Sequence, residues 1–126
     1  LRRTGALALS LVAEEDGCVI GQVTFSPAIA PGAAQGWYTL GPVSVDPDRQ
    51  KQGIGAGLIE AGLEHLRAIK AEGCILVGNP AYYARFGFRV SPQHAPADGH
   101  EHFFQLLAFG DAVPAGTFAY DPAFFA

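Results

Sequence analysis

One junction in the sequence joins a strand pattern, a turn and the start of a helix. Residues 43–45 read Val-Ser-Val, a short β-branched run that predicts a strand. Asp46 and Pro47 then predict a turn, and a basic loop with Gly53 and Gly55 leads into a long helical pattern. Backbone N–H groups at a helix N-terminus lack intrahelical partners and lie at the positive end of the helix dipole. The junction is therefore predicted to bind an anion.

The composition of this loop favours a phosphorylated ligand. Gly53 and Gly55 carry no Cβ, so a phosphate group can approach the main chain closely. Arg49 and Lys51 add positive charge at the same place. We interpret the loop as a cradle for a pyrophosphate, with plain loop glycines as the alternative. A dinucleotide-binding fingerprint is disfavoured because Leu58 occupies the position of its third glycine.

Length and composition narrow the class of protein. A chain of 126 residues that is 49% apolar and 16% charged is expected to form a single domain, residues 1–126, with one core. The net charge of −4 gives no support for nucleic-acid binding, and no apolar stretch approaches the length of a membrane span. Cys18 and Cys74 match neither a disulfide framework nor a metal-ligand spacing. We therefore expect free thiols and a cytoplasmic protein without a metal.

Apolar periodicity and turn signals predict an α/β fold with a mixed sheet. Asp16-Gly17 separates two β-branched runs, residues 7–14 and 18–27, which predicts a hairpin. Residues 37–45 predict a third strand, in which Gly41-Pro42 implies a bulge or an unpaired edge. Shorter predicted elements are a loop at 28–35, a strand at 74–78, a helix at 80–85, a strand at 88–90, a loop at 91–99 and strands at 102–109 and 117–120.

The long helix is predicted over residues 53–72, with Gly73 as its C-terminal stop. The residues expected on its buried face are Ile54, Leu58, Ala61, Gly62, Leu66 and Ile69.

Two motifs together resemble the GNAT superfamily of N-acetyltransferases. The spacing Gln50-x-x-Gly53-x-Gly55 is similar to the acyl-CoA-binding motif of that superfamily. The run Asn79-Pro80-Ala81-Tyr82-Tyr83-Ala84-Arg85-Phe86-Gly87-Phe88 resembles its helix-to-strand signature, in which a Tyr precedes a Gly-Phe pair by four residues. That run is most similar to the YhbS-like subgroup of predicted acetyltransferases. The resemblance extends from about residue 7 to residue 120, with both motifs in the proper order.

The resemblance implies a GNAT-like fold with a splayed central sheet and transfer of an acetyl group from acetyl-CoA to a primary amine. The amine is a small molecule or a peptide, no metal is needed, and a homodimer is left open. The strand and helices that usually begin such a fold are expected to be largely absent from this chain, which contains no Met. The implied cofactor-binding residues are Val43, Ser44, Val45, Arg49, Gln50, Lys51, Gln52, Gly53, Ile54, Gly55, Ala56, Asn79, Tyr82, Tyr83 and Arg85.

Gly41-Pro42 has a functional interpretation under this resemblance. If Pro42 breaks pairing, the third strand splays away from residues 74–78 and opens a slot. In GNAT folds the pantetheine arm lies in that slot and bonds to unpaired main-chain groups, here near Val43 and Val45. One such N–H faces the thioester carbonyl and stabilises the oxyanion. A mere strand defect is the alternative.

Tyr83 is the implied catalytic residue, with a phenol that protonates or hydrogen-bonds the departing thiolate. Packing of its ring in the core is the alternative. The general base is left open, because residues 37–45 contain no acid. A water chain is one candidate, and the candidate side chains are Asp46, His65, His94, His100, Glu101 and His102. The missing base also keeps open a second function, a non-catalytic module that binds acyl-CoA.

Overall fold

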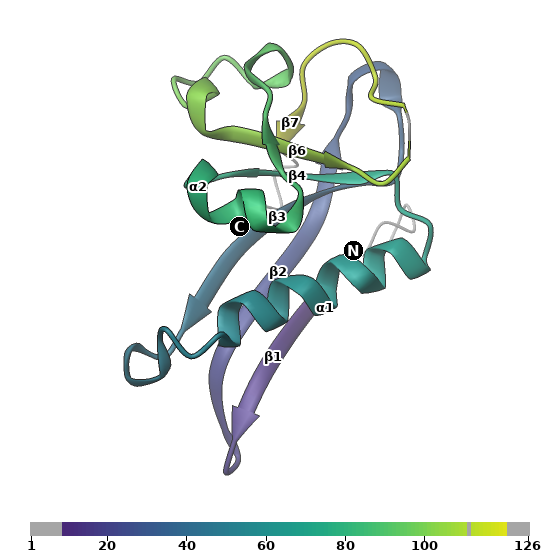
Figure 1. The fold of residues 1–126 in the computed structure, drawn as a ribbon. Helices are drawn as coiled ribbons and strands as arrows, with labels where there is room; N and C mark the ends of the chain where they lie inside the picture. The colour runs from purple at the N-terminus through teal and green to yellow at the C-terminus, as the bar shows by residue number, and fades with distance from the viewer. Residues whose placement is uncertain (1–8, 111, 121–126) are drawn as a thin grey trace.

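The computed structural model describes residues 9–110 and 112–120 and shows a mixed α/β fold (Figure 1). The sheet has the strand order β1-β2-β3-β4-β6-β5, and β7 pairs with the end of β2. The strands are β1 (Leu9–Glu15), β2 (Cys18–Ile29), β3 (Trp37–Val45), β4 (Gly73–Val77), β5 (Arg89–Val90), β6 (Phe104–Ala108) and β7 (Ala119–Tyr120). The helices are α1 (Ile54–Ala68) and α2 (Pro80–Tyr83), with 3₁₀ turns at Pro31–Ala33, Pro47–Arg49, Ala84–Phe86, Pro92–His94 and Glu101–Phe103.

The predicted hairpin between β1 and β2 is confirmed. Asp16 and Gly17 connect the strands with φ angles of 53° and 82°. Two consecutive positive φ angles are the requirement of a type I′ turn, whose twist matches that of the strands it joins. The loop predicted over residues 28–35 is wrong at its start, because Ala28 and Ile29 continue β2 and pair with β7.

β3 contains the bulge that Gly41-Pro42 predicted. Val43 pairs with Val23, but Leu40 pairs with Phe25, so β3 has one more residue than β2 between these pairs. One extra residue reverses the alternation of side chains along a strand. As a result Leu40 and Val43 both pack into the core cluster that α1 covers.

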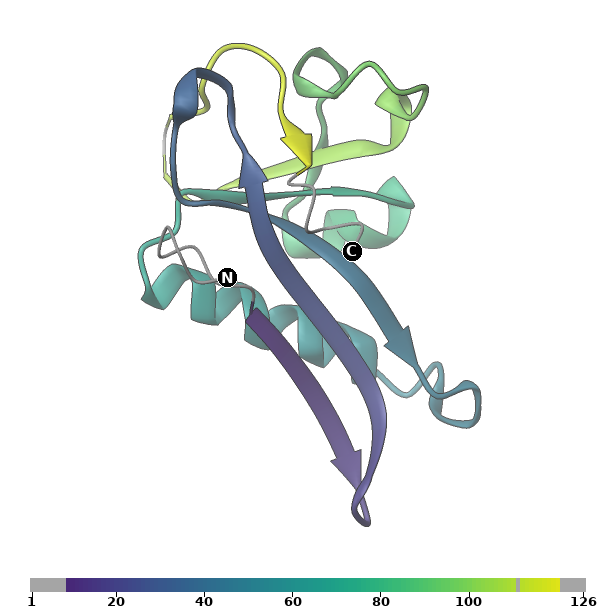
Figure 2. The same cartoon turned by 180° about the vertical axis from the view of Figure 1, so that it is seen from behind.

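The predicted splay of the sheet is also present. β3 and β4 are parallel neighbours only at Trp37–Gly73, Tyr38–Cys74 and Thr39–Ile75. Beyond Thr39, β3 continues along β2, whereas Leu76 and Val77 of β4 pair with β6. Both views show β3 and β4 diverging towards their C-terminal ends (Figures 1 and 2). Within the described residues, the last six residues of β3 therefore have no strand on the side that faces β4.

Helix α1 covers one face of the sheet, and its buried face differs from the predicted one. Ala61 and Ile69 are exposed, and Ile59 and Leu63 are buried instead. Ile69 lies just beyond the last helical residue. The buried stripe follows every fourth residue from Ile54 and is widened by Ile59 and Leu63, which lie next to it on the helix surface, and not by Ala61. The buried residues of α1 are Leu58, Ile59, Gly62, Leu63 and Leu66.

The predicted end of this helix is wrong as well. The helix ends at Ala68, and Lys70 adopts the left-handed conformation with φ 64°. Ala71 N–H donates to Leu66 O at 2.9 Å and Lys70 N–H donates to Arg67 O at 3.0 Å. This is the Schellman arrangement, which usually places Gly where Lys70 stands. Gly73 instead begins β4, where a Cβ would overlap the Trp37 ring.

A second apolar cluster covers the opposite face of the sheet. Trp37, Ile75, Phe104 and Phe118 form its centre, and the rings of Trp37 and Phe118 meet edge to face with centroids 5.0 Å apart. Both faces of the central strands are therefore buried, as expected for a mixed sheet. Within the described residues no helix is long and apolar enough to cross a membrane.

We predict that Gly62 sets how closely α1 approaches β2. A Cβ at Gly62 would overlap the fully buried Phe25 ring. Overpacking of this kind typically costs about 1–3 kcal/mol. Gly62→Ala should therefore lower the free energy of unfolding measured by urea denaturation, despite the higher helix propensity of Ala.

Gly57→Ala is the matched control, because a Cβ at Gly57 on the same helix meets nothing within 4 Å. It should raise the free energy of unfolding by up to about 1 kcal/mol through helix propensity. Equal stabilisation by both substitutions would show that Gly62 is not a packing requirement.

Candidate functional site

The N-terminus of α1 presents free backbone donors. Gly53 is the N-cap and has φ 83°, a left-handed conformation that favours glycine. The first N–H that α1 satisfies is that of Gly57, which donates to Gly53 O at 2.9 Å. Helical geometry leaves the N–H groups of Ile54, Gly55 and Ala56 without intrahelical acceptors. These free donors are where the sequence predicted them, and the binding of an anion to them stays a prediction.

The structure explains the presence of glycine differently at the two motif positions, 53 and 55. Gly53 is required by the backbone conformation, and a Cβ there would meet no atom within 4 Å. Gly55 has ordinary helical geometry, and a Cβ there would make an ordinary 3.5 Å contact with Val45. Nothing in the packing of the described residues therefore demands glycine at position 55. The space beside it is available to a ligand.

The loop before α1 is ordered by its own polar side chains. Asp46 Oδ1 accepts a hydrogen bond from Asp48 N–H at 2.9 Å, which initiates the 3₁₀ turn Pro47–Arg49. Arg49 Nε donates to Glu15 Oε1, so this cation is tied to the β1–β2 hairpin. Lys51 and Gln52 are exposed beside the helix N-terminus. Of the two predicted cations, Lys51 is thus the one with no ion pair among the described residues.

The free edge of β3 is the edge that faces β4 beyond Thr39. Its polar main-chain groups point into the space where the two strands separate, which we call the splay. Asp46 N–H donates to Ile20 O of β2 at 2.8 Å. The carbonyl of Val45 belongs to the same trans peptide and must point the opposite way, towards the free edge. Gln50 Nε2 donates to this carbonyl at 3.2 Å. Because strand residues alternate, the N–H and C=O of Val43 also point to the free edge, whereas those of Ser44 point towards β2.

A cavity of about 400 Å³ lies where β3 and β4 separate. It is lined from β3 by the bulge and its neighbours, from β4 by its last residue, and from α2 by Tyr83. Two further segments, the connection between β5 and β6 and strand β7, close its other side. The lining residues are Thr39, Leu40, Gly41, Pro42, Val43, Val77, Tyr83, Asp98, His100 and Tyr120.

Tyr83 faces this cavity from an aromatic cluster. Its ring packs against Tyr82, Phe86 and Phe88, with centroids 4.9, 6.2 and 6.1 Å away. A Cβ at Gly78 would lie 2.8 Å from the Tyr83 ring, so glycine at the end of β4 makes room for it. Burial, and to a lesser degree the neighbouring Tyr82, raises the pKa of the Tyr83 phenol. Packing and reactivity are therefore compatible at this residue, since its hydroxyl forms no hydrogen bond with another described residue.

The rest of the second motif builds the short helix. Asn79 is the N-cap of α2, and its Oδ1 accepts a hydrogen bond from Ala81 N–H at 2.9 Å. Arg85 Nε donates to Tyr82 O at 3.0 Å, and its guanidinium lies 4.4 Å from the centroid of the Tyr82 ring. These contacts assign structural roles to the side chains of Asn79 and Arg85, which the sequence predicted as cofactor ligands. Contact of either with a cofactor stays a prediction.

Three polar residues of the cavity were neither predicted site residues nor candidate bases. Asp98 lines it from the β5–β6 connection, Tyr120 lines it from β7, and Thr39 lies at the last residue pair between β3 and β4. Burial, followed by the charge of Asp98, raises the pKa of the Tyr120 phenol to about 12. The Thr39 side chain is 1% exposed, and its hydroxyl has no hydrogen-bond partner among the described residues. The Asp98-Gly99 dipeptide, which predicts a turn, is the one sequence signal near any of these three residues.

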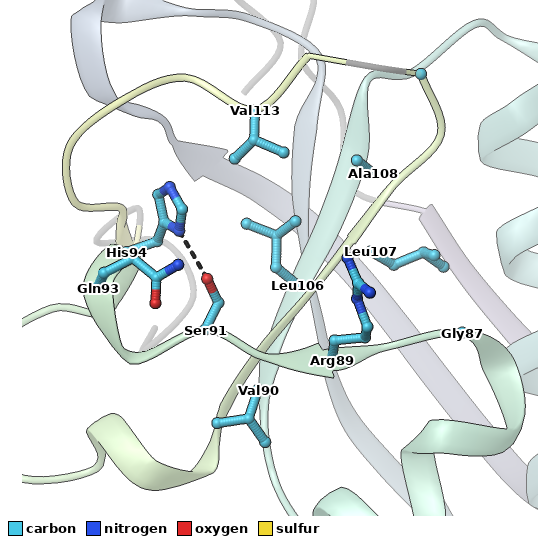
Figure 3. A pocket seen from close by; sticks show the side chains of 11 residues that line it. Gly87, Arg89, Val90, Ser91, Gln93, His94, Leu106, Leu107, Ala108 and Val113 are labelled. Carbon is cyan, nitrogen blue, oxygen red and sulfur yellow. Dashed lines mark hydrogen bonds between the residues drawn. The ribbon is translucent and has the colours of Figure 1, made fainter.

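A larger cavity of about 850 Å³ lies at the outer edge of the sheet, between β5, β6 and Val113 (Figure 3). None of the predicted cofactor-binding or catalytic residues lines it, but His94, one of the candidate bases, does. Ser91 Oγ and His94 Nδ1 are hydrogen-bonded at 2.6 Å there, and His94 O accepts from Phe118 N–H at 2.8 Å. The first bond lies within the β5–β6 connection, and the second ties that connection to the C-terminal segment. No three His, Cys, Asp or Glu residues in the described part of the chain could together hold a metal ion.

Comparison with known proteins agrees with this geometry. Residues 7–90 match the acetyltransferase (GNAT) domain model. The chain is 39% identical over 121 residues to the uncharacterized N-acetyltransferase YhbS of Escherichia coli K12, covering 93% of this chain and 72% of YhbS.

Two solved structures are also similar. One is a GNAT family acetyltransferase from Brucella melitensis in complex with acetyl-CoA, with 52% identity, a TM-score of 0.80 and coverage of 95% of this chain and 70% of that one. The other is E. coli YhbS in complex with CoA, with a TM-score of 0.86, 33% identity in the structural alignment and coverage of 97% and 72%. The chain therefore belongs to the GNAT family of acetyltransferases.

Proposed function

We propose that this protein is an N-acetyltransferase that moves an acetyl group from acetyl-CoA directly to a primary amine. One observation carries the proposal. The free edge of β3 connects the free N-terminus of α1 to the cavity at the splay, so that the two form one continuous surface. Similar proteins crystallised with acetyl-CoA or CoA support the same co-substrate.

The cofactor is proposed to bind along this continuous surface. Its pyrophosphate accepts hydrogen bonds from the N–H groups of Ile54, Gly55 and Ala56, with Lys51 nearby. Its pantetheine arm bonds to Val43 and Val45 as an added strand would. The Gln50 amide, which now bonds to Val45 O, must yield that carbonyl or share it.

Chemistry is proposed to occur in the cavity. The amine nitrogen attacks the thioester carbon, an N–H of the β3 edge stabilises the oxyanion, and the C–S bond breaks. Tyr83 then donates its proton to the sulfur. A raised pKa keeps this phenol protonated at neutral pH, which an acid requires.

An acyl-enzyme intermediate is not part of the proposal. Cys74 is fully buried, and desolvation raises the pKa of its thiol far above the ordinary value, so it stays an unreactive thiol. Cys18 is exposed next to the hairpin turn and lines neither cavity described above. A non-catalytic acyl-CoA-binding module is the second candidate function, favoured by the absence of an acidic residue on β3.

The first prediction tests the pyrophosphate cradle. Gly55→Glu places a carboxylate where the phosphates are proposed to bind, so the affinity for acetyl-CoA should fall by about 2 kcal/mol or more, roughly thirtyfold. Calorimetry measures this directly. Gly57→Glu is the matched control, because it adds the same charge on the same helix turn but to its other side. Unchanged acetyl-CoA binding by a folded Gly55→Glu variant would show that the pyrophosphate does not bind at the N-terminus of α1.

The second prediction concerns Tyr83. Tyr83→Phe keeps the aromatic packing and deletes only the hydroxyl. If the phenol protonates the thiolate, kcat should drop roughly 10- to 100-fold while acetyl-CoA affinity changes little. An unaltered kcat would make Tyr83 a packing residue alone.

The third prediction concerns the order of events. Direct attack requires both substrates to be bound together, so initial-rate plots should give intersecting lines. Cys18→Ser should leave kcat unchanged. Parallel lines, or an acetylated cysteine found by mass spectrometry, would show that the acetyl group passes through the enzyme.

A further inference from the structure

We propose that His100 is the general base, taking the proton from a small primary ammonium that enters the cavity. Asp98 holds in place the loop that carries His100. The assignment rests on the proposed function and adds to it the residue that activates the acceptor.

Position distinguishes His100 from the other candidate bases. Of the six side chains that the sequence left open, His100 is the one that lines the described cavity at the splay. His94 lines the other cavity and is bonded to Ser91. His65 is exposed on α1. Asp46 caps the 3₁₀ turn Pro47–Arg49, which precedes that helix. Glu101 and His102 follow His100 directly but line neither cavity.

Asp98 fixes the loop that carries His100. Its Oδ1 accepts a hydrogen bond from the backbone N–H of His100 at 3.0 Å, and the same oxygen lies 3.6 Å from His100 Nδ1. The carboxylate therefore holds the loop in place and lies beside Nδ1, on the side of the ring away from Nε2. Nε2 is the ring nitrogen left for the substrate, and it must be unprotonated to accept a proton.

Charge within the cavity is suited to an ammonium ion. The other titratable groups that line it with His100 are Asp98, Tyr83 and Tyr120. The raised pKa values of Tyr83 and Tyr120 keep both phenols neutral at physiological pH. Asp98 is then the formal negative charge of the described lining, and it attracts a cation to the same place as the base.

Thr39 lines the cavity at the last residue pair between β3 and β4. Its hydroxyl is buried without a hydrogen-bond partner in the described structure. Burying an unpaired hydroxyl costs about 1–3 kcal/mol, so such groups usually have a partner. Its oxygen has almost no accessible surface, so a ligand in the cavity reaches it only if neighbouring atoms move, and the base assignment does not depend on it.

The protons balance in the proposed step. His100 Nε2 takes one proton from the ammonium, and the neutral nitrogen attacks the thioester carbon. The C–S bond breaks, Tyr83 protonates the thiolate, and the second nitrogen proton restores the phenol through solvent. Because 63% of the His100 side chain is exposed, the imidazolium returns its proton directly to water.

The test compares two amines of nearly equal shape, ethylamine and 2,2,2-trifluoroethylamine. At neutral pH the first is almost entirely an ammonium ion and the second is largely neutral. His100→Gln should lower kcat/KM for ethylamine roughly 100-fold, in the range for general-base catalysis, and should lower it much less for trifluoroethylamine. Acetyl-CoA affinity measured by calorimetry should not change.

Two further variants sharpen the result. His102→Gln is the matched control and should behave as the wild type with both amines. Asp98→Asn, which tests a positioning residue, keeps an oxygen for the His100 N–H but removes the charge, so kcat/KM should fall for ethylamine, which enters as a cation, and stay nearly unchanged for trifluoroethylamine. Equal losses for both amines in His100→Gln, or no loss, would overturn the base assignment while leaving the transferase intact. No CoA release by the wild type with either amine would overturn the proposal that the cavity accepts a small primary ammonium, and the base assignment with it.

Discussion

The separation of β3 from β4 after Thr39 is the constraint on which the site depends. Buried main-chain N–H and C=O groups normally have hydrogen-bond partners. In this sheet β2 satisfies one edge of β3, but beyond Thr39 no described strand lies along the other. The groups of Val43 and Val45 on that edge are therefore available to an extended polar ligand. The pantetheine arm of CoA, with its two amides, is such a ligand.

The bulge at Gly41-Pro42 and the packing of α1 place this edge next to the helix N-terminus. The extra residue in β3 turns Val43 towards α1, and Val45 lies close to Gly55. Gly62 lets the helix approach Phe25 closely. A one-residue change in register would turn Val43 and Val45 to the other face and break the path from the phosphate cradle to the cavity.

Local signals predicted much of this arrangement. The Asp16-Gly17 turn, the Gly41-Pro42 bulge and the glycines before α1 act through backbone conformation, which depends on a few adjacent residues. The helix end was missed because Lys70 adopts a left-handed conformation that usually belongs to glycine. The polar lining of the cavity was missed because Thr39, Asp98 and Tyr120 come from three segments that only the tertiary fold brings together.

The most direct measurement of the central claim is amide hydrogen exchange along β3 with and without CoA. The N–H groups of Val43 and Val45 face the splay, and those of Ser44 and Asp46 face β2. The account predicts that CoA slows exchange at Val43 and Val45, with far smaller changes at Ser44 and Asp46. Equal protection at all four residues, or none at Val43 and Val45, would contradict binding of the cofactor along the free edge of β3.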